Sequence, residues 1–151
     1  MGLIKILSSA IIGTSAMTLF SYIISQSKNK NFLEPELVSQ LVKRLPKSYT
    51  GTQADIAGWT AHYAIGVLFV AIYTKTWAVM KIKPSVSSGA ILGTLSGVVG
   101  VVGWHCMFKL HPAPPPKNRK QYYEQLIIAH TVFGIFSALT CKLLQSNTTD
   151  D

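Results

Sequence analysis

Four apolar stretches, each long enough to cross a bilayer, constrain the fold of this chain more than any other feature. A spanning helix needs about 20 mostly apolar residues, and residues 3–25, 57–80, 85–108 and 122–144 meet that length. Only 13% of the 151 residues are charged, against roughly 25% in soluble globular domains. The sequence therefore predicts an all-α integral membrane protein, a four-helix bundle formed by one transmembrane domain over residues 1–151.

The connections between the apolar stretches add a hairpin and a fifth helix. Residues 81–84 leave room for a tight turn alone, so the second and third spanning helices should be antiparallel neighbours. Residues 34–45 carry Pro35 in a first helical turn and apolar side chains at helical spacing. This pattern predicts a short amphipathic helix on the bilayer surface, or alternatively a lid over the mouth of the bundle. Glu34 and Glu36 complement its dipole.

The net charge of +8 raises the question of nucleic acid as a partner. The 14 lysine and arginine residues lie beside the ends of the apolar segments rather than along one helix face. We therefore expect a lipid bilayer as the partner and no nucleic acid. Five of these cations fall on the side that holds both termini and nine on the other side, among them Lys47 and Lys117. The positive-inside rule favours the second side as cytoplasmic.

Glycines give the third spanning segment a packing signature. Gly89, Gly93 and Gly97 recur at every fourth residue, and Gly100 and Gly103 follow. Small residues at this spacing let two helix backbones touch in a membrane. The spacing is equally suited to packing within the bundle and to a homo-oligomer formed through this helix.

Three histidines in three different spanning segments are the candidate functional residues. Antiparallel threading brings His62, His105 and His130 toward the membrane face that holds the long loops. Ionisable side chains inside spanning helices are functional-site hypotheses by default. Asp55 and Glu124, on the same side, are candidate partners for a ligand or a metal.

Three interpretations of these histidines stay open at this point. Each imidazole can serve helix packing through a hydrogen bond to a neighbour. A metal site for zinc or iron would make the chain a membrane metalloenzyme, although no HExxH spacing supports it. Alternatively, His62 or His105 pairs with His130 to hold haem or to carry protons. No catalytic residue is indicated, and an oligomeric transporter or channel subunit is a further alternative.

Residues 58–139 resemble the YagU-like family of small bacterial inner-membrane proteins of unassigned activity. The matching features are His62 with the apolar run that leads to Tyr73, Lys81-Ile82-Lys83, Gly89-Ala90, His105, the proline-rich residues 111–116 and Ala129-His130. The resemblance implies a multi-pass protein of the bacterial inner (cytoplasmic) membrane with a role in acid-stress survival. Together with the histidines, it leads us to expect a non-enzymatic protein with a histidine-lined polar pocket near one membrane face.

Overall fold

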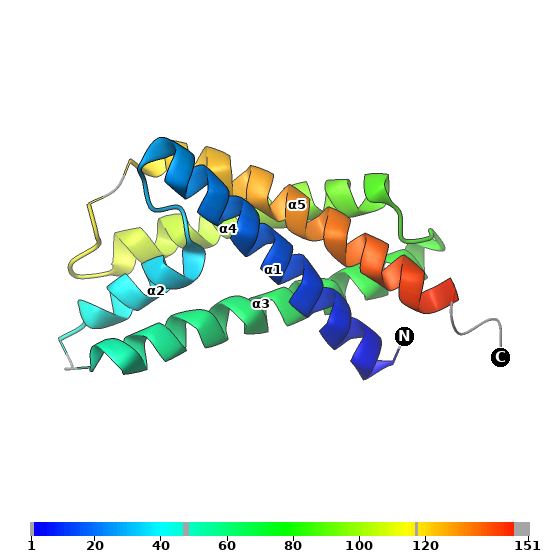
Figure 1. The fold of residues 1–151 in the computed structure, drawn as a ribbon, viewed down its shortest axis with the longest axis horizontal. Coiled ribbons are helices and arrows are strands. Elements are labelled where there is room, and N and C mark those ends of the chain that lie inside the picture. The colour runs from blue at the N-terminus through cyan, green and yellow to red at the C-terminus, as the bar shows by residue number, and fades with distance from the viewer. Residues whose placement is uncertain (1, 47–48, 117, 147–151) are drawn as a thin grey trace.

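A computed structural model describes residues 2–46, 49–116 and 118–146 (Figure 1). Within these residues the chain is all helical, and its five helices are α1 (Leu3–Lys28), α2 (Glu34–Lys43), α3 (Gly51–Met80), α4 (Val86–Leu110) and α5 (Arg119–Ser146). The four longer ones are long and apolar enough to span a membrane. The all-α helical bundle is thus confirmed. Lys47 and Lys117 lie outside the described residues.

The helix ends follow local hydrogen bonding as well as hydrophobicity. α3 begins at Gly51, earlier than the apolar stretch suggested, because Thr50 and Gln53 form a reciprocal capping box. Ser85 and Ser88 form a second capping box at the start of α4. The capping box therefore lets α3 begin several residues before its apolar stretch.

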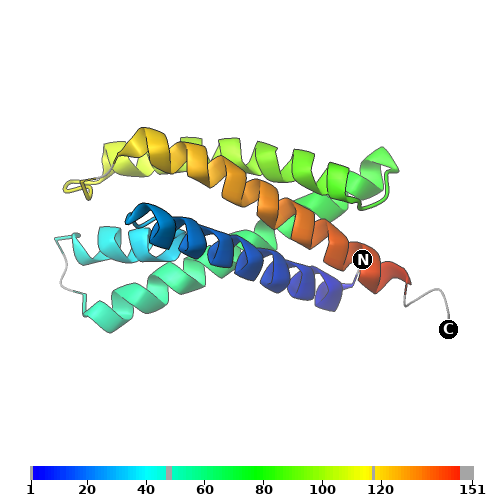
Figure 2. The ribbon, with the colours of Figure 1, turned by 45° about the horizontal axis from the view of Figure 1, so that its top comes forward.

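The helices form two layers (Figure 2). In one layer α4 packs along α5, and in the other α3 packs against α1 and α2, while contacts between α1 and α5 join the layers. The start of α1 and the end of α5 lie at the end that holds the α3–α4 turn (Figure 1). α3 and α4 are antiparallel, but they are not one of the extensively packed pairs. The expected antiparallel arrangement is present, but α3 packs more extensively on α1 and α2, and α4 on α5.

Glycines determine which helices become partners. A methyl group on Gly97 would lie 2.8 Å from the Cα of Ile127 on α5, and one on Gly89 would lie 2.6 Å from the Cβ of Ala138. On α3, a methyl group on Gly58 would collide with the Pro35 carbonyl of α2, and one on Gly66 with the Thr14 hydroxyl of α1. The α4 glycines therefore select α5, and the α3 glycines select α1 and α2.

The short helix α2 has the expected position in the chain but a different environment. Its apolar residues Leu37 and Leu41 are buried, and α2 packs on α3. Lys43 forms an ion pair of 2.8 Å with Asp55 on α3, and His111 after α4 donates a hydrogen bond from Nε2 to the Leu41 carbonyl at 2.9 Å. The apolar face of α2 is thus buried in protein, as the lid alternative requires.

We predict opposite effects from alanine at two glycines of α4. Gly93→Ala should lower the free energy of unfolding by roughly 1–3 kcal/mol through overpacking, because the methyl group would lie 3.0 Å from the Cα of Thr131. Gly103→Ala should raise it by about 0.5–1 kcal/mol through helix propensity, because nothing lies within 4 Å of the added methyl. Denaturant titration of both variants in detergent measures the difference. Equal effects would contradict the packing described for α4 and α5.

Candidate ligand-binding cavity

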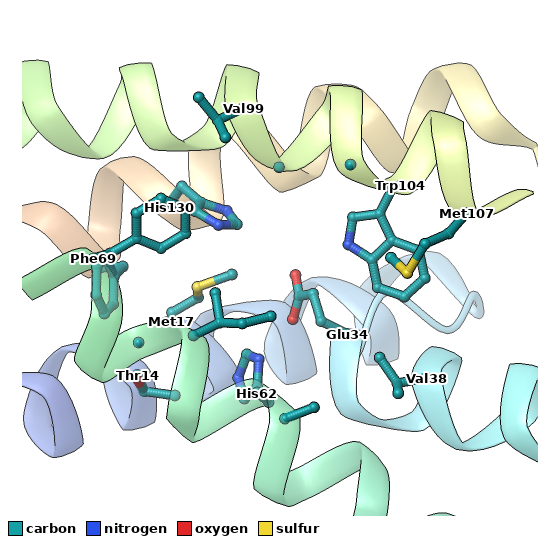
Figure 3. A pocket seen from close by; sticks show the side chains of 16 residues that line it. Thr14, Met17, Glu34, Val38, His62, Phe69, Val99, Trp104, Met107 and His130 are labelled. Carbon is teal, nitrogen blue, oxygen red and sulfur yellow. The ribbon is translucent and has the colours of Figure 1, made fainter.

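A cavity of about 320 Å³ lies where α3 and α4 diverge, and all five helices contribute to its walls (Figure 3). We call it the α3–α4 cavity. Most of its walls are apolar, as in small-molecule sites generally, and include Met17, Phe69 and Phe133. Its polar side chains are Thr14, Glu34, His62, His130 and the indole of Trp104.

The α3–α4 cavity opens between the two helices that give it its name. Among its lining residues, Ile65 of α3 is 50% exposed, and Val99 and Met107 of α4 are 60% and 41% exposed. The lining residues from α1 and α5, by contrast, are nearly all buried. The opening therefore lies on the side of the helix bundle, between the exposed apolar surfaces of α3 and α4.

Tyr73 joins α3 to α4 on the side of the α3–α4 turn. Its hydroxyl donates to the Leu92 carbonyl at 3.1 Å and also bonds the Ser96 hydroxyl. Its ring packs edge-on against Phe133 at 5.9 Å between centroids. Tyr73 thus bridges α3 to α4 and α5 at a level between the cavity and the α3–α4 turn.

The carboxylate of Glu34 enters the cavity from α2. Glu34 is 4% exposed, and Figure 3 shows its carboxylate reaching into the space between the layers. Ser21 of α1 donates to Glu34 Oε1 at 3.4 Å and accepts a hydrogen bond of 2.9 Å from the Gln125 amide of α5. A buried polar relay from α5 through α1 to α2 thus orients this carboxylate.

The imidazole of His130 enters the cavity from α5 (Figure 3). The side chain is 7% exposed, and its Nδ1 lies 2.9 Å from the Leu126 carbonyl oxygen. A carbonyl oxygen can accept but not donate, so Nδ1 carries the proton. In the neutral ring, Nε2 is then left as a hydrogen-bond acceptor. Phe69 packs edge-on against the ring at 5.9 Å.

His62 of α3 carries its proton on the other nitrogen. Its Nε2 lies 2.9 Å from the Thr18 hydroxyl, and that hydroxyl donates its single proton to the Thr14 carbonyl at 2.8 Å. The Thr18 oxygen must therefore accept from His62 Nε2, which leaves Nδ1 as the acceptor of the neutral ring. The two histidines of the cavity thus have opposite tautomers.

The structure does not bring the other three candidate residues into this cavity. His105 is exposed and lies beside Tyr123, at 6.5 Å between ring centroids. Its neighbour Trp104 lines the cavity instead, because one residue along a helix turns the side chain by about 100°. Glu124 is exposed, and Asp55 is exposed and bonded to Lys43 and Ser39 rather than to a histidine. Of the three histidines predicted to share a site, His62 and His130 line this cavity.

The metal interpretation needs a cluster of ligands. Over residues 2–46, 49–116 and 118–146, no group of three or more His, Cys, Asp or Glu side chains is placed to hold a metal ion. The zinc or iron site built from His62, His105 and His130 thus finds no ligand set in the part of the chain that the structure describes. Haem, which needs fewer ligands, stays a prediction.

Glu34 is a residue of the cavity that was not among the candidate site residues predicted from the sequence, although its carboxylate was expected on the same side of the membrane as the histidines. Its position in the first turn of α2 is also accounted for by the helix dipole. A signal was nevertheless present, because Glu34, Leu37, Val38 and Leu41 stand at the i, i+3, i+4, i+7 positions of one helix face. A carboxylate on the apolar face of an amphipathic helix is expected to be buried.

Comparisons of the chain with models of protein families, with curated proteins and with solved structures find no match. The resemblance to the YagU-like family stays a prediction, and the function must be argued from the geometry of the α3–α4 cavity.

The hydrogen bonds predict a tautomer difference that nitrogen NMR can measure. In protein with ¹⁵N-labelled imidazoles, the neutral ring of His130 should be protonated at Nδ1 and that of His62 at Nε2. Signals are assigned by their loss in His62→Gln and His130→Gln. His111, whose Nδ1 accepts from the Ala113 amide, serves as an internal Nε2-protonated reference. The same tautomer at His62 and His130 would contradict the site geometry.

Metal analysis and an absorption spectrum of the purified protein test the remaining interpretations. We expect no stoichiometric zinc or iron, because no group of three or more ligand side chains is placed to hold a metal ion among the described residues. A Soret band would support the haem alternative, in which His62 or His105 pairs with His130. Stoichiometric metal that disappears when His62, His105 and His130 are replaced would instead establish the metalloprotein alternative.

Proposed function

We propose that the protein is a multi-pass membrane protein with four spanning helices that binds a small ligand in the α3–α4 cavity and catalyses no reaction. The observation that carries this proposal is the cavity itself, in which a buried carboxylate and two imidazoles stand within apolar walls. Buried ionisable groups are costly in a bilayer and tend to mark binding sites or pathways. A bacterial inner membrane and a link to acid stress are proposed from the family resemblance.

The distribution of side chains supports membrane insertion. Large apolar residues are exposed along α1, α3 and α4, for example Ile11, Leu68 and Leu95. The interior, in contrast, contains small and hydroxyl side chains, and Ser9 and Ser137 are fully buried. Soluble monomers rarely expose such large contiguous apolar surfaces, whereas membrane bundles commonly place small polar residues between their helices. α2 would then lie at the membrane face and close that end of the cavity.

The shape of the cavity favours binding over conduction. Tyr73 and Ser96 bridge α3 and α4 beyond the cavity, so the cavity has a closed end within the chain. The glycine face of α4 is occupied by α5. A channel assembled from several copies through that face would first have to displace α5, and we therefore prefer a binding protein to a channel subunit.

Membrane topology gives the first test of this proposal. Four spanning helices put both termini on one side, and the positive-inside rule puts them outside the cytoplasm. Reporter fusions after residue 151 and within residues 111–118 should therefore report opposite sides, and the protein should stay in the membrane after carbonate extraction. Release of the protein by carbonate would show that it is not an integral membrane protein.

A variant that fills the cavity gives the second test. Gly103 lines the cavity, and no atom lies within 4 Å of the position that a Cβ would take there. The side chain of Gly103→Leu should therefore fill part of the cavity without disturbing helix packing. Native mass spectrometry of protein extracted in mild detergent should find a bound small molecule on the wild type. We expect that molecule to be lost in Gly103→Leu and retained in Val102→Leu, whose side chain faces outward next to it. Equal retention in both variants would refute binding in this cavity.

A further inference from the structure

We infer that the ligand of the α3–α4 cavity is a lipophilic amine, bound as its ammonium ion with the head at Glu34 and the apolar tail toward the opening between α3 and α4. This inference rests on the proposed function, and it adds the chemical class and the orientation of the ligand.

The polar groups of the cavity are mainly acceptors. The Glu34 carboxylate accepts hydrogen bonds, and the hydrogen bonds of His62 and His130 leave each neutral ring with one acceptor nitrogen. Among the described residues that line the cavity there is no lysine, arginine, asparagine or glutamine, and the side-chain donors left among them are Trp104 and Thr14. A ligand head that complements this set must donate several hydrogen bonds, as an alkylammonium with three N–H groups does.

Charge points to the same class. Among the described residues that line the cavity, the acidic one is Glu34, and its carboxylate is buried. A cation in the cavity would form a charge-assisted hydrogen bond with Glu34. A fatty acid or another anion would instead place like charges together in a low dielectric.

Aromatic rings complete a site for a cation. Phe69, Trp104 and Phe133 line the cavity together with the two imidazoles, and aromatic faces attract ammonium ions. Figure 3 shows the Trp104 indole beside the Glu34 carboxylate and Phe69 at the opposite wall of the cavity. An ammonium head held at Glu34 thus has the Trp104 indole as a neighbouring aromatic group.

The opening explains why the ligand has an apolar tail. The exposed lining residues Ile65, Val99 and Met107 form an apolar rim. This rim belongs to the spanning parts of α3 and α4, so in the proposed membrane orientation it faces lipid. A volume of about 320 Å³ is at the lower end of the range for small-molecule sites, so a short-chain amine suits it.

The experiment compares four probes of equal chain length: octylammonium, octyltrimethylammonium, octanol and octanoate. Binding to the wild type in nanodiscs is measured by titration calorimetry, with empty nanodiscs to subtract partitioning into lipid. We expect octylammonium to bind roughly tenfold or more tightly than octanol, the difference expected for hydrogen bonds to a charged group. Octyltrimethylammonium, which has no N–H donor, should bind less tightly than octylammonium, and octanoate should bind least. Octanoate or octanol binding as tightly as octylammonium would overturn the inference.

Two matched variants assign the head of the ligand to Glu34. Glu34→Gln should weaken octylammonium roughly tenfold and leave octanol unchanged, while Glu36→Gln, at an exposed carboxylate of the same helix, should change neither. Unaltered octylammonium binding in Glu34→Gln would overturn the assignment. If Glu34→Gln does not fold, the preference of the wild type among the four probes still decides the ligand class.

The two proposals fail in different ways. If octanol binds, Gly103→Leu abolishes that binding, and octylammonium shows no advantage, then the amine is wrong and the binding cavity stands. If none of the probes binds and no small molecule accompanies the purified protein, both proposals are wrong.

Discussion

The close approach of helix backbones at glycines is the constraint on which the rest of this structure depends. α4 meets α5 where Gly89, Gly93 and Gly97 leave no room for a side chain, and α3 meets α2 and α1 at Gly58 and Gly66. These contacts assign α3 and α4 to different layers although a short turn connects them. The α3–α4 cavity is a direct consequence, because two helices that are each bound to another partner cannot close the space between them.

The interior is organised by polar groups and the exterior by apolar ones. Ser21 accepts from Gln125 and donates to Glu34, Thr18 links His62 to the backbone of α1, and the Cys141 thiol donates to the Ser9 hydroxyl. In lipid, where no water competes, such bonds can hold helices together, although each contributes roughly 1 kcal/mol. The same bonds fix the orientation of the carboxylate and the imidazoles, so packing and site geometry have a common origin.

The sequence predicts the helices well and the cavity in part. The long apolar stretches reveal four of the helices, and the spacing around Pro35 reveals the fifth. His62 and His130 do reach one cavity, but depth along the helix could not exclude His105, since its exclusion depends on rotation about α4. The spacing of the five glycines of α4 suggests one packing surface. In the structure, however, Gly103 lines the cavity while Gly97 touches α5. Sequence spacing shows which residues share one face of a helix. Only the packing of the helices shows whether that face meets a neighbouring helix or a cavity.

The acidic group of the cavity comes from α2, which is not one of the four long helices. Its position therefore depends on the contacts that attach α2 to the rest of the protein. The far end of α2 is attached to α3 by the ion pair of Lys43 and Asp55, both of which are substantially exposed to solvent. Exposed ion pairs weaken as salt screens them, and anionic headgroups compete for a lysine at the membrane surface. In the proposed membrane orientation, the ionic composition at the bilayer surface therefore affects how firmly α2 holds the Glu34 carboxylate inside the protein, so lipid composition bears on the geometry of the cavity.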